Sequence, residues 1–271
     1  MLFAYNAPHC FPVIRIFFSY SPHIFLPMQY FKLLSALLLS SPALFAQNTD
    51  TTKQKDHLAL YRRALEYNDL GSAAYSLTNY LYWGGDEKYS DTLALVYYGM
   101  NNLGGAYKLA GEINGKDPKN VTALTLLADV SGRAGEIKKS LEWYEKLIEI
   151  SPTAYNHYQL ATKQFVLERN MECKQSLQKV IADSTAAMEQ KVRLDIGEVY
   201  GEDVPVLAAA LNMMGAIAFK EKDTAGAINW YSRAISAYPQ FVIAKQNLDD
   251  LKKGSTPAKP ATPSKPPVKK G

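Results

Sequence analysis

Small residues recur at a nearly constant interval along this chain, each within the same pattern of apolar positions. In order, they are Ala73, Ala106, Ser140, Cys173 and Ala227. The first three separations are 33, 34 and 33 residues, and the fourth, 54 residues, is one such interval plus about 20 residues. Apolar residues stand thirteen positions before each small residue and four and seven positions after it, which is the spacing of one face of a helix. The pattern predicts an all-α fold of helical hairpins that each pack on their neighbours.

Two further sets of equivalent positions in the repeat predict that the helices of a hairpin lie close together and where the second helix ends. Small residues stand twelve positions before the recurring residue in four units, as Ala94, Ala128, Ala161 and Gly215. Prolines stand twelve positions after it in three units, as Pro118, Pro152 and Pro239. Proline lacks a backbone N–H and clashes with the preceding turn, so each of them ends a second helix.

With these columns the chain resembles the tetratricopeptide repeat family. The best unit, residues 208–241, carries Met214-Gly215, Ala227, Tyr231, Ala234 and Pro239, and the unit 121–153 carries Leu127-Ala128, Ser140, Tyr144, Leu147 and Pro152. The resemblance implies a right-handed solenoid of helical hairpins whose first helices line a groove for a protein partner. It does not identify the partner, because one fold serves many functions.

The interval predicts five repeats, an insertion and a cap. The repeats lie near 54–86, 87–120, 121–153, 154–187 and 208–241, the insertion covers 188–207, and a capping helix covers 242–253. Within the insertion Val192, Leu194 and Ile196 alternate with polar residues, which predicts one strand of a β-hairpin. This hairpin is either part of a binding face or a structural plug between the fourth and fifth repeats, and a plain loop is a further alternative.

The N-terminal 46 residues are expected to be a targeting segment. From Met28 the chain has a short start with Lys32, an apolar run from Leu33 to Phe45, and then Ala46-Gln47. This layout is typical of a secretory signal over 28–46, with an uncleaved anchor as the alternative. Residues 1–27 fit an over-extended start of the reading frame or a long targeting sequence. We therefore expect an exported protein, periplasmic or associated with the bacterial cell envelope.

Charge is unevenly distributed along the chain. Residues 47–251 hold 22 basic and 26 acidic side chains, and an acidic body argues against nucleic acid as a partner. Residues 254–271 are rich in Pro, Lys, Ser and Thr without an acidic side chain, which predicts a disordered tail.

The sequence carries no recognisable catalytic motif, so we expect a protein that is not an enzyme and has no cofactor and no metal. Cys173 occupies a small-residue position and is expected to be a buried packing residue. His57 and His157 occupy the same repeat position three units apart, which favours packing over a shared metal site.

The family resemblance places groove-facing residues 18, 15, 11 and 8 positions before each recurring small residue. The candidates from these positions, with the neighbouring Arg133, are Arg62, Tyr98, Asp129, Arg133, Tyr155, Tyr158, Phe165, Asn212 and Phe219. Aromatic rings with scattered charges suit an extended peptide or a helix, and Tyr155, Tyr158 and Phe165 are the strongest candidates. The alternative is that several of these rings only pack against adjacent helices.

Two functions follow from these observations. The first is a non-enzymatic scaffold of the bacterial cell envelope that binds a protein or peptide segment in the groove. The second is a binding module for cell wall or carbohydrate that uses the aromatic surface and the basic tail. Some family members hold a partner's terminal carboxylate with a Lys/Asn/Arg set, which is not reproduced here, as Leu58, Arg62 and Leu95 show.

Overall fold

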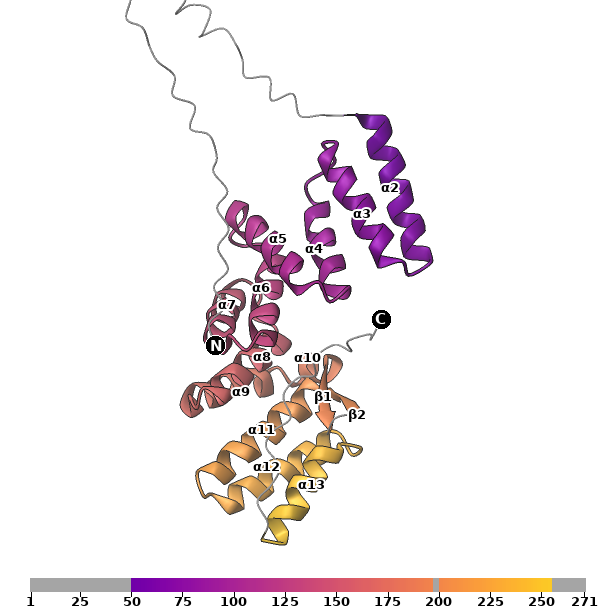
Figure 1. Cartoon of the computed structure of the whole chain (residues 1–271). Helices are drawn as coiled ribbons and strands as arrows, with labels where there is room; N and C mark the ends of the chain where they lie inside the picture. The colour runs from indigo at the N-terminus through magenta and orange to yellow at the C-terminus, as the bar shows by residue number, and fades with distance from the viewer. Residues whose placement is uncertain (1–49, 197–199, 255–271) are drawn as a thin grey trace, which may run out of the picture. The chain divides into compact units, whose positions relative to one another are not determined.

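The computed structural model describes residues 50–196 and 200–254 (Figure 1). The targeting segment predicted for 1–46 lies outside these residues, as does the tail predicted for 254–271 beyond its first residue. Among the described helices, none combines the length and apolar character needed to cross a membrane.

Twelve helices and one antiparallel two-stranded sheet form the regular structure of the described residues. The helices are α2 (Thr51–Glu66), α3 (Leu70–Tyr82), α4 (Tyr89–Gly99), α5 (Leu103–Lys116), α6 (Val121–Arg133), α7 (Ile137–Ile150), α8 (Ala154–Val166), α9 (Asn170–Ala182), α10 (Ser184–Glu189), α11 (Val206–Lys220), α12 (Thr224–Ala237) and α13 (Val242–Lys252). The strands are β1 (Lys191–Ile196) and β2 (Tyr200–Pro205).

Consecutive helices form five hairpins, and each hairpin packs on the next. The pairs are α2 with α3, α4 with α5, α6 with α7, α8 with α9, and α11 with α12 (Figure 1). The second helix of one hairpin packs on the first helix of the following one, and α9 reaches α11 across the insertion. Helix α13 packs on α12 and completes the series. The predicted solenoid of about five helical hairpins with a C-terminal capping helix is confirmed.

The small residues that recur along the sequence lie in the interior of the hairpins. All five, Ala73, Ala106, Ser140, Cys173 and Ala227, are completely buried. In the last hairpin a Cβ atom on Gly215 would lie only 2.6 Å from the ring of Tyr231, so the two helices approach as closely as a glycine allows. In this hairpin the small residue twelve positions before Ala227 therefore allows the paired helices to approach closely.

The turn inside each hairpin has the same backbone geometry. A residue with positive φ, between 53° and 83°, stands five positions before the recurring small residue, at Asn68, Asn101, Gly135, Glu168 and Lys222. A residue in the left-handed backbone conformation follows the end of the first helix, and the second helix begins two residues after it. Side-chain caps follow in three hairpins, where Asp69, Asn102 and Asp223 accept backbone N–H groups of the next turn.

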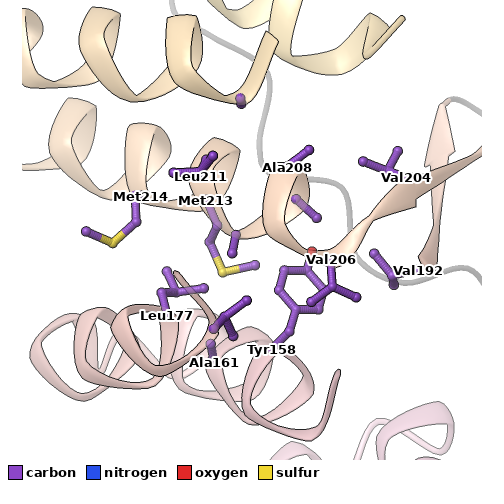
Figure 2. Close-up of a cluster of buried hydrophobic side chains, with 14 of the residues drawn as sticks. Tyr158, Ala161, Leu177, Val192, Val204, Val206, Ala208, Leu211, Met213 and Met214 are labelled. Carbon is purple, nitrogen blue, oxygen red and sulfur yellow. The ribbon is translucent and has the colours of Figure 1, made fainter. Parts of the chain in front are cut away.

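The residues between α9 and α11 form the short helix α10, which begins before the predicted insertion, and the β1–β2 hairpin within it, and they contribute to the core. Val192 and Val204 are directly opposite each other in the antiparallel register. Together with Leu194 they are buried against Tyr158 of α8 and Val206 of α11, as the labelled side chains in Figure 2 show in part. The predicted β-hairpin is confirmed, whereas α10 was not expected.

Two polar side chains of the insertion hold the ends of neighbouring helices. Gln190 Oε1 accepts the backbone N–H of Tyr155 in the first turn of α8 at 2.8 Å. Glu202 Oε2 accepts the backbone N–H of Val242, the first residue of α13, at 3.2 Å. Helix N-termini leave such N–H groups without partners inside the helix. These contacts are those of a structural plug that joins α8, α11 and α13.

Candidate partner-binding site

Predicted groove positions of three consecutive hairpins lie close together in one group of side chains. Tyr98 comes from α4, Asp129 and Arg133 from α6, and Tyr155 and Lys163 from α8; we call these five residues the inner cluster. Residues four apart on a helix share one face, which puts Asp129 beside Arg133. The charge of Asp129 acts on both Tyr155 and Lys163, so these two side chains of α8 lie near it. The Arg133 guanidinium lies 5.2 Å from the centre of the Tyr98 ring.

Asp129 is the central group of the inner cluster. Tyr144, from α7, donates its phenolic hydrogen to the Asp129 carboxylate. Burial raises the pKa of Asp129, while this hydrogen bond and the charges of Lys163 and Arg133 act in the opposite direction. Burial and the charge of Asp129 raise the pKa of Tyr98 and of Tyr155, although the two rings come from different hairpins. The residues of the cluster therefore influence one another electrostatically.

Lys163 reaches from α8 towards α6. A Cβ atom on Gly132 would lie 3.5 Å from Lys163 Nζ and 3.4 Å from its Cε, so the end of the Lys163 side chain lies beside α6 at Gly132. The same Nζ lies 5.6 Å from the centre of the Tyr144 ring. Burial lowers the pKa of Lys163, and the charge of Asp129 counteracts part of this effect.

The inner cluster has more positive charge than its own carboxylate balances. Arg133 donates one hydrogen bond, from Nη2 to Asn101 Oδ1 at 2.7 Å, and its buried Nε and Nη1 have no acceptor among the described residues. Within the same part of the chain, neither Arg133 nor Lys163 takes part in an ion pair. Two cations and one carboxylate leave a formal charge of +1, which suits an anionic group of a partner.

Three further predicted residues lie outside the inner cluster. Arg62 is exposed on α2. Phe165, near the end of α8, is half-buried, and Lys220 Nζ lies 5.3 Å from the centre of its ring. Phe219, at the end of α11, is also half-buried and packs against the small core around Tyr231. These two phenylalanines combine partial exposure with packing on neighbouring helices.

Two predicted groove residues belong to the interior instead. Tyr158 is 1% exposed and packs in the main core beside Val206 (Figure 2), and Asn212 is 2% exposed. Asn212 Oδ1 accepts a hydrogen bond from Nδ2 of Asn247 on α13 at 3.1 Å. The placement of both residues on an open groove is therefore corrected. The position of a residue within the repeat predicts where it lies in its own hairpin. It does not predict which residues the insertion and the capping helix cover.

Lys163 and Tyr144 were missed as site residues by sequence reasoning. Lys163 stands ten positions before Cys173, between two groove positions of the register, and Tyr144 occupies an apolar core column. Neither residue stands at a position that the family resemblance assigns to the groove. The two histidines lie on separate helices, α2 and α8, and the described residues contain no group of three side chains suited to a metal.

The arrangement defines a class, a helical-hairpin repeat protein with a charged aromatic cluster on its first helices. The family model of the tetratricopeptide repeat matches residues 121–153 and 208–241, which are the third and fifth hairpins. These two matches support a tetratricopeptide repeat protein.

Solved structures share the fold at low sequence identity. A tetratricopeptide repeat protein from Parabacteroides merdae is 16% identical with a TM-score of 0.59, and the alignment covers 74% of this chain and 73% of that one. MamA from Desulfovibrio magneticus RS-1 is 13% identical with a TM-score of 0.56, and the alignment covers 70% of this chain and 97% of that one. No curated protein is similar enough in sequence to count as a relative.

Proposed function

We propose that this protein is a non-enzymatic scaffold that binds a segment of a partner protein along the first helices α4, α6 and α8. The observation that carries the proposal is the inner cluster, where side chains from three consecutive hairpins meet and two cations have no ion-pair partner among the described residues. Aromatic and arginine side chains are the residue types that dominate protein interfaces. A partner segment that follows the first helices contacts all three hairpins at once.

The proposed location is the bacterial cell envelope. It rests on the sequence of residues 28–46, which has the layout of a secretory signal. Export places the protein among envelope partners, and the experiments below use extracts of that compartment. A fusion of residues 1–60 to a reporter that is active only outside the cytoplasm tests this location. An inactive reporter fusion that is stably made would contradict it.

Site-directed photo-crosslinking tests the binding face. Leu95 is 50% exposed on α4, one turn before Tyr98, and Tyr75 is 67% exposed on the second helix α3. A photoreactive phenylalanine analogue at position 95 is expected to crosslink a partner in envelope extracts, and the same analogue at position 75 is the matched control. Crosslinks of equal yield to the same proteins at both positions, or none at position 95, would refute the proposed face.

Exposed tyrosines of the first hairpin favour the second candidate, a cell-wall or carbohydrate binding module. Tyr67, Tyr75 and Tyr82 are each about two-thirds exposed, and flat exposed rings are suitable for stacking on sugars. If this function holds, replacing Tyr75 and Tyr82 with alanine reduces co-sedimentation with purified cell wall. Unchanged sedimentation of this double variant would leave the protein-binding scaffold as the function.

A further inference from the structure

We propose that two copies of this chain associate through β1, which pairs with the β1 of the second copy to form one continuous antiparallel sheet. The proposal goes beyond the partner-binding face on the first helices, because it uses only the β1–β2 hairpin (Figure 1). It is drawn from the direction of the backbone groups of β1, the position of Pro205 in β2 and the order of charges along β1.

One hydrogen bond determines which backbone groups of β1 point away from β2. Val206 donates its N–H to the carbonyl oxygen of Gln190 at 2.9 Å, and the register of the hairpin places these two residues directly opposite each other. Bonded and non-bonded pairs alternate along an antiparallel ladder. Every second residue of β1, beginning with its first, therefore directs its N–H and C=O groups away from β2. These residues are Lys191, Arg193 and Asp195.

The outward edge of β1 is unpaired. Its N–H and C=O groups have no backbone hydrogen-bond partner within residues 50–196 and 200–254. The three side chains on this edge are exposed, whereas the two between them, Val192 and Leu194, are buried in the core. An exposed strand edge of this kind is a template on which another strand can add.

The outward edge of β2 is less suitable for such pairing. By the same alternation, Asp203 and Pro205 direct their backbone groups away from β1. Pro205 has no N–H to donate, and proline at such a position is a common protection of an edge strand. The edge of β1 has no such interruption, because each of its outward residues carries both a donor and an acceptor.

The charges of β1 are complementary to those of a second β1. In a twofold antiparallel pair centred on Arg193, Lys191 of each copy is directly opposite Asp195 of the other. Neither Lys191 nor Asp195 takes part in an ion pair among the described residues. Arg193 is opposite its own counterpart, and each guanidinium already pairs with Asp203 of its own hairpin, with 3.3 Å between Nη1 and Oδ1. The strand therefore favours a second copy as its neighbour.

The register centred on Arg193 also gives the most backbone hydrogen bonds. It uses all three outward residues of each strand, which amounts to about six bonds. A shift by two residues in either direction leaves about four, and one of these shifts puts Lys191 opposite Arg193. Like charges directly opposite each other are destabilising, so that register is disfavoured.

Cysteine crosslinking of the full-length chain tests the pairing. In a Cys10→Ser background, Arg193→Cys places one thiol opposite its own counterpart, at the separation that a disulfide spans. We expect mild oxidation to convert this variant into a covalent dimer. Asp203→Cys is the matched control, because it is also exposed but lies on β2, one strand further from the twofold axis. It should stay monomeric.

Charge exchange tests whether the neighbour is a second copy. Sedimentation equilibrium over about 1–200 µM protein covers the weak association expected of a small interface. Lys191→Asp and Asp195→Lys each put like charges opposite each other twice, so each should weaken the dimer by about fivefold or more. The two changes together restore opposite charges and should return the dissociation constant to within about twofold of that of the unaltered protein.

Proline substitution tests the edge itself. Arg193→Pro removes an outward N–H without removing a bond to β2, so the hairpin should form while the dimer is lost. Asp203→Pro is the equivalent change on the other edge and should leave the dimer intact. Thermal melts show whether each variant folds, and if Arg193→Pro does not, the charge exchange decides.

The outcomes separate this proposal from the binding face. A chain that is monomeric at about 200 µM, a dimer that persists in folded Arg193→Pro, or a double charge variant as weak as the single ones would overturn the proposal. Equal crosslinking of Asp203→Cys and Arg193→Cys would do the same. None of these results changes the photo-crosslinking expected at Leu95, which tests the first helices alone.

Discussion

Ser140 and Cys173 occupy the same position in successive hairpins and donate equivalent hydrogen bonds. Ser140 Oγ lies 2.7 Å from the carbonyl oxygen of Ala128, and Cys173 Sγ lies 3.2 Å from that of Ala161. Each acceptor belongs to the first helix of the hairpin and each donor to the second. The small-residue column therefore holds paired helices together by hydrogen bonds as well as by close packing where the residue is not alanine.

The thiol of Cys173 should be unreactive in the folded protein. The side chain is completely buried, and burial raises its pKa to about 12, so almost none of it is thiolate at neutral pH. In a Cys10→Ser background, a thiol reagent should label native protein at least about a hundredfold more slowly than protein in denaturant. Rapid labelling under native conditions would contradict this burial. Cys173→Ser should remain folded, because Ser140 makes the same bond.

Removing the cap that β2 provides to α13 should destabilise the C-terminal end of the fold. Glu202→Ala removes the acceptor for the Val242 N–H and should lower the free energy of unfolding by about 1 kcal/mol, the usual value of a helix cap. For a domain of this size the melting temperature then falls by about 2–4 °C. Glu202→Gln keeps an oxygen acceptor and is the control. Equal melting temperatures for Glu202→Ala and unaltered protein would show that the contact contributes nothing.

Glycine at a left-handed turn position should stabilise the last hairpin. Lys222 has φ of 65°, and this conformation costs a residue with a Cβ atom about 1–2 kcal/mol. Glycine removes this cost but loses more conformational entropy on folding, which offsets part of the gain. Lys222→Gly should therefore raise the free energy of unfolding, measured by chemical denaturation, by about 0.5–1 kcal/mol. The reverse change, Gly135→Ala, is at the equivalent position, and an added Cβ there would meet no atom within 4 Å. This change should lower the free energy of unfolding by about 1 kcal/mol. Changes of opposite sign would refute the shared turn geometry.

Stability should depend on pH through Asp129. Its pKa in the folded state is raised above 3.8, so it stabilises the fold below the unfolded pKa and loses that contribution as the pH rises through the folded pKa. Asp129→Asn does not titrate and keeps an acceptor for Tyr144. The melting temperature of this variant, relative to unaltered protein, should rise between about pH 4 and about pH 7. A relative melting temperature that falls over this range would contradict the cost of burying the Asp129 charge.

The burial of the recurring repeat positions was predictable from the sequence, because they face the partner helix of their own hairpin. The five recurring small residues are buried as their spacing indicated, and the β-hairpin was visible in the alternation around Val192 and Leu194. The turns were harder to recognise, because the left-handed positions are occupied by Asn, Gly, Glu and Lys rather than by glycine alone. The common position within the repeat, and not the residue type, marks them.

The candidate site was predictable only in part. Tyr98, Asp129 and Tyr155 came from the predicted groove positions of the repeat, and Arg133 was included as the neighbour of one. All four lie in the inner cluster, whereas Lys163 stands between two predicted groove positions and was missed. Tyr158 and Tyr155 were both predicted from groove positions of the fourth repeat. Tyr158 nevertheless lies in the core, because the insertion packs over it. An isolated sequence position does not show which side of a helix a later segment will cover.

The sequence by itself determined the architecture of this protein, because hairpin pairing depends on side chains that recur at short, regular separations. It also determined that the chain is a repeat protein with an acidic body between basic ends. Only the tertiary structure decided which groove positions stay accessible and which charges meet. Those properties depend on contacts between residues far apart in the chain, such as Glu202 with Val242 and Asn212 with Asn247, which no local pattern encodes.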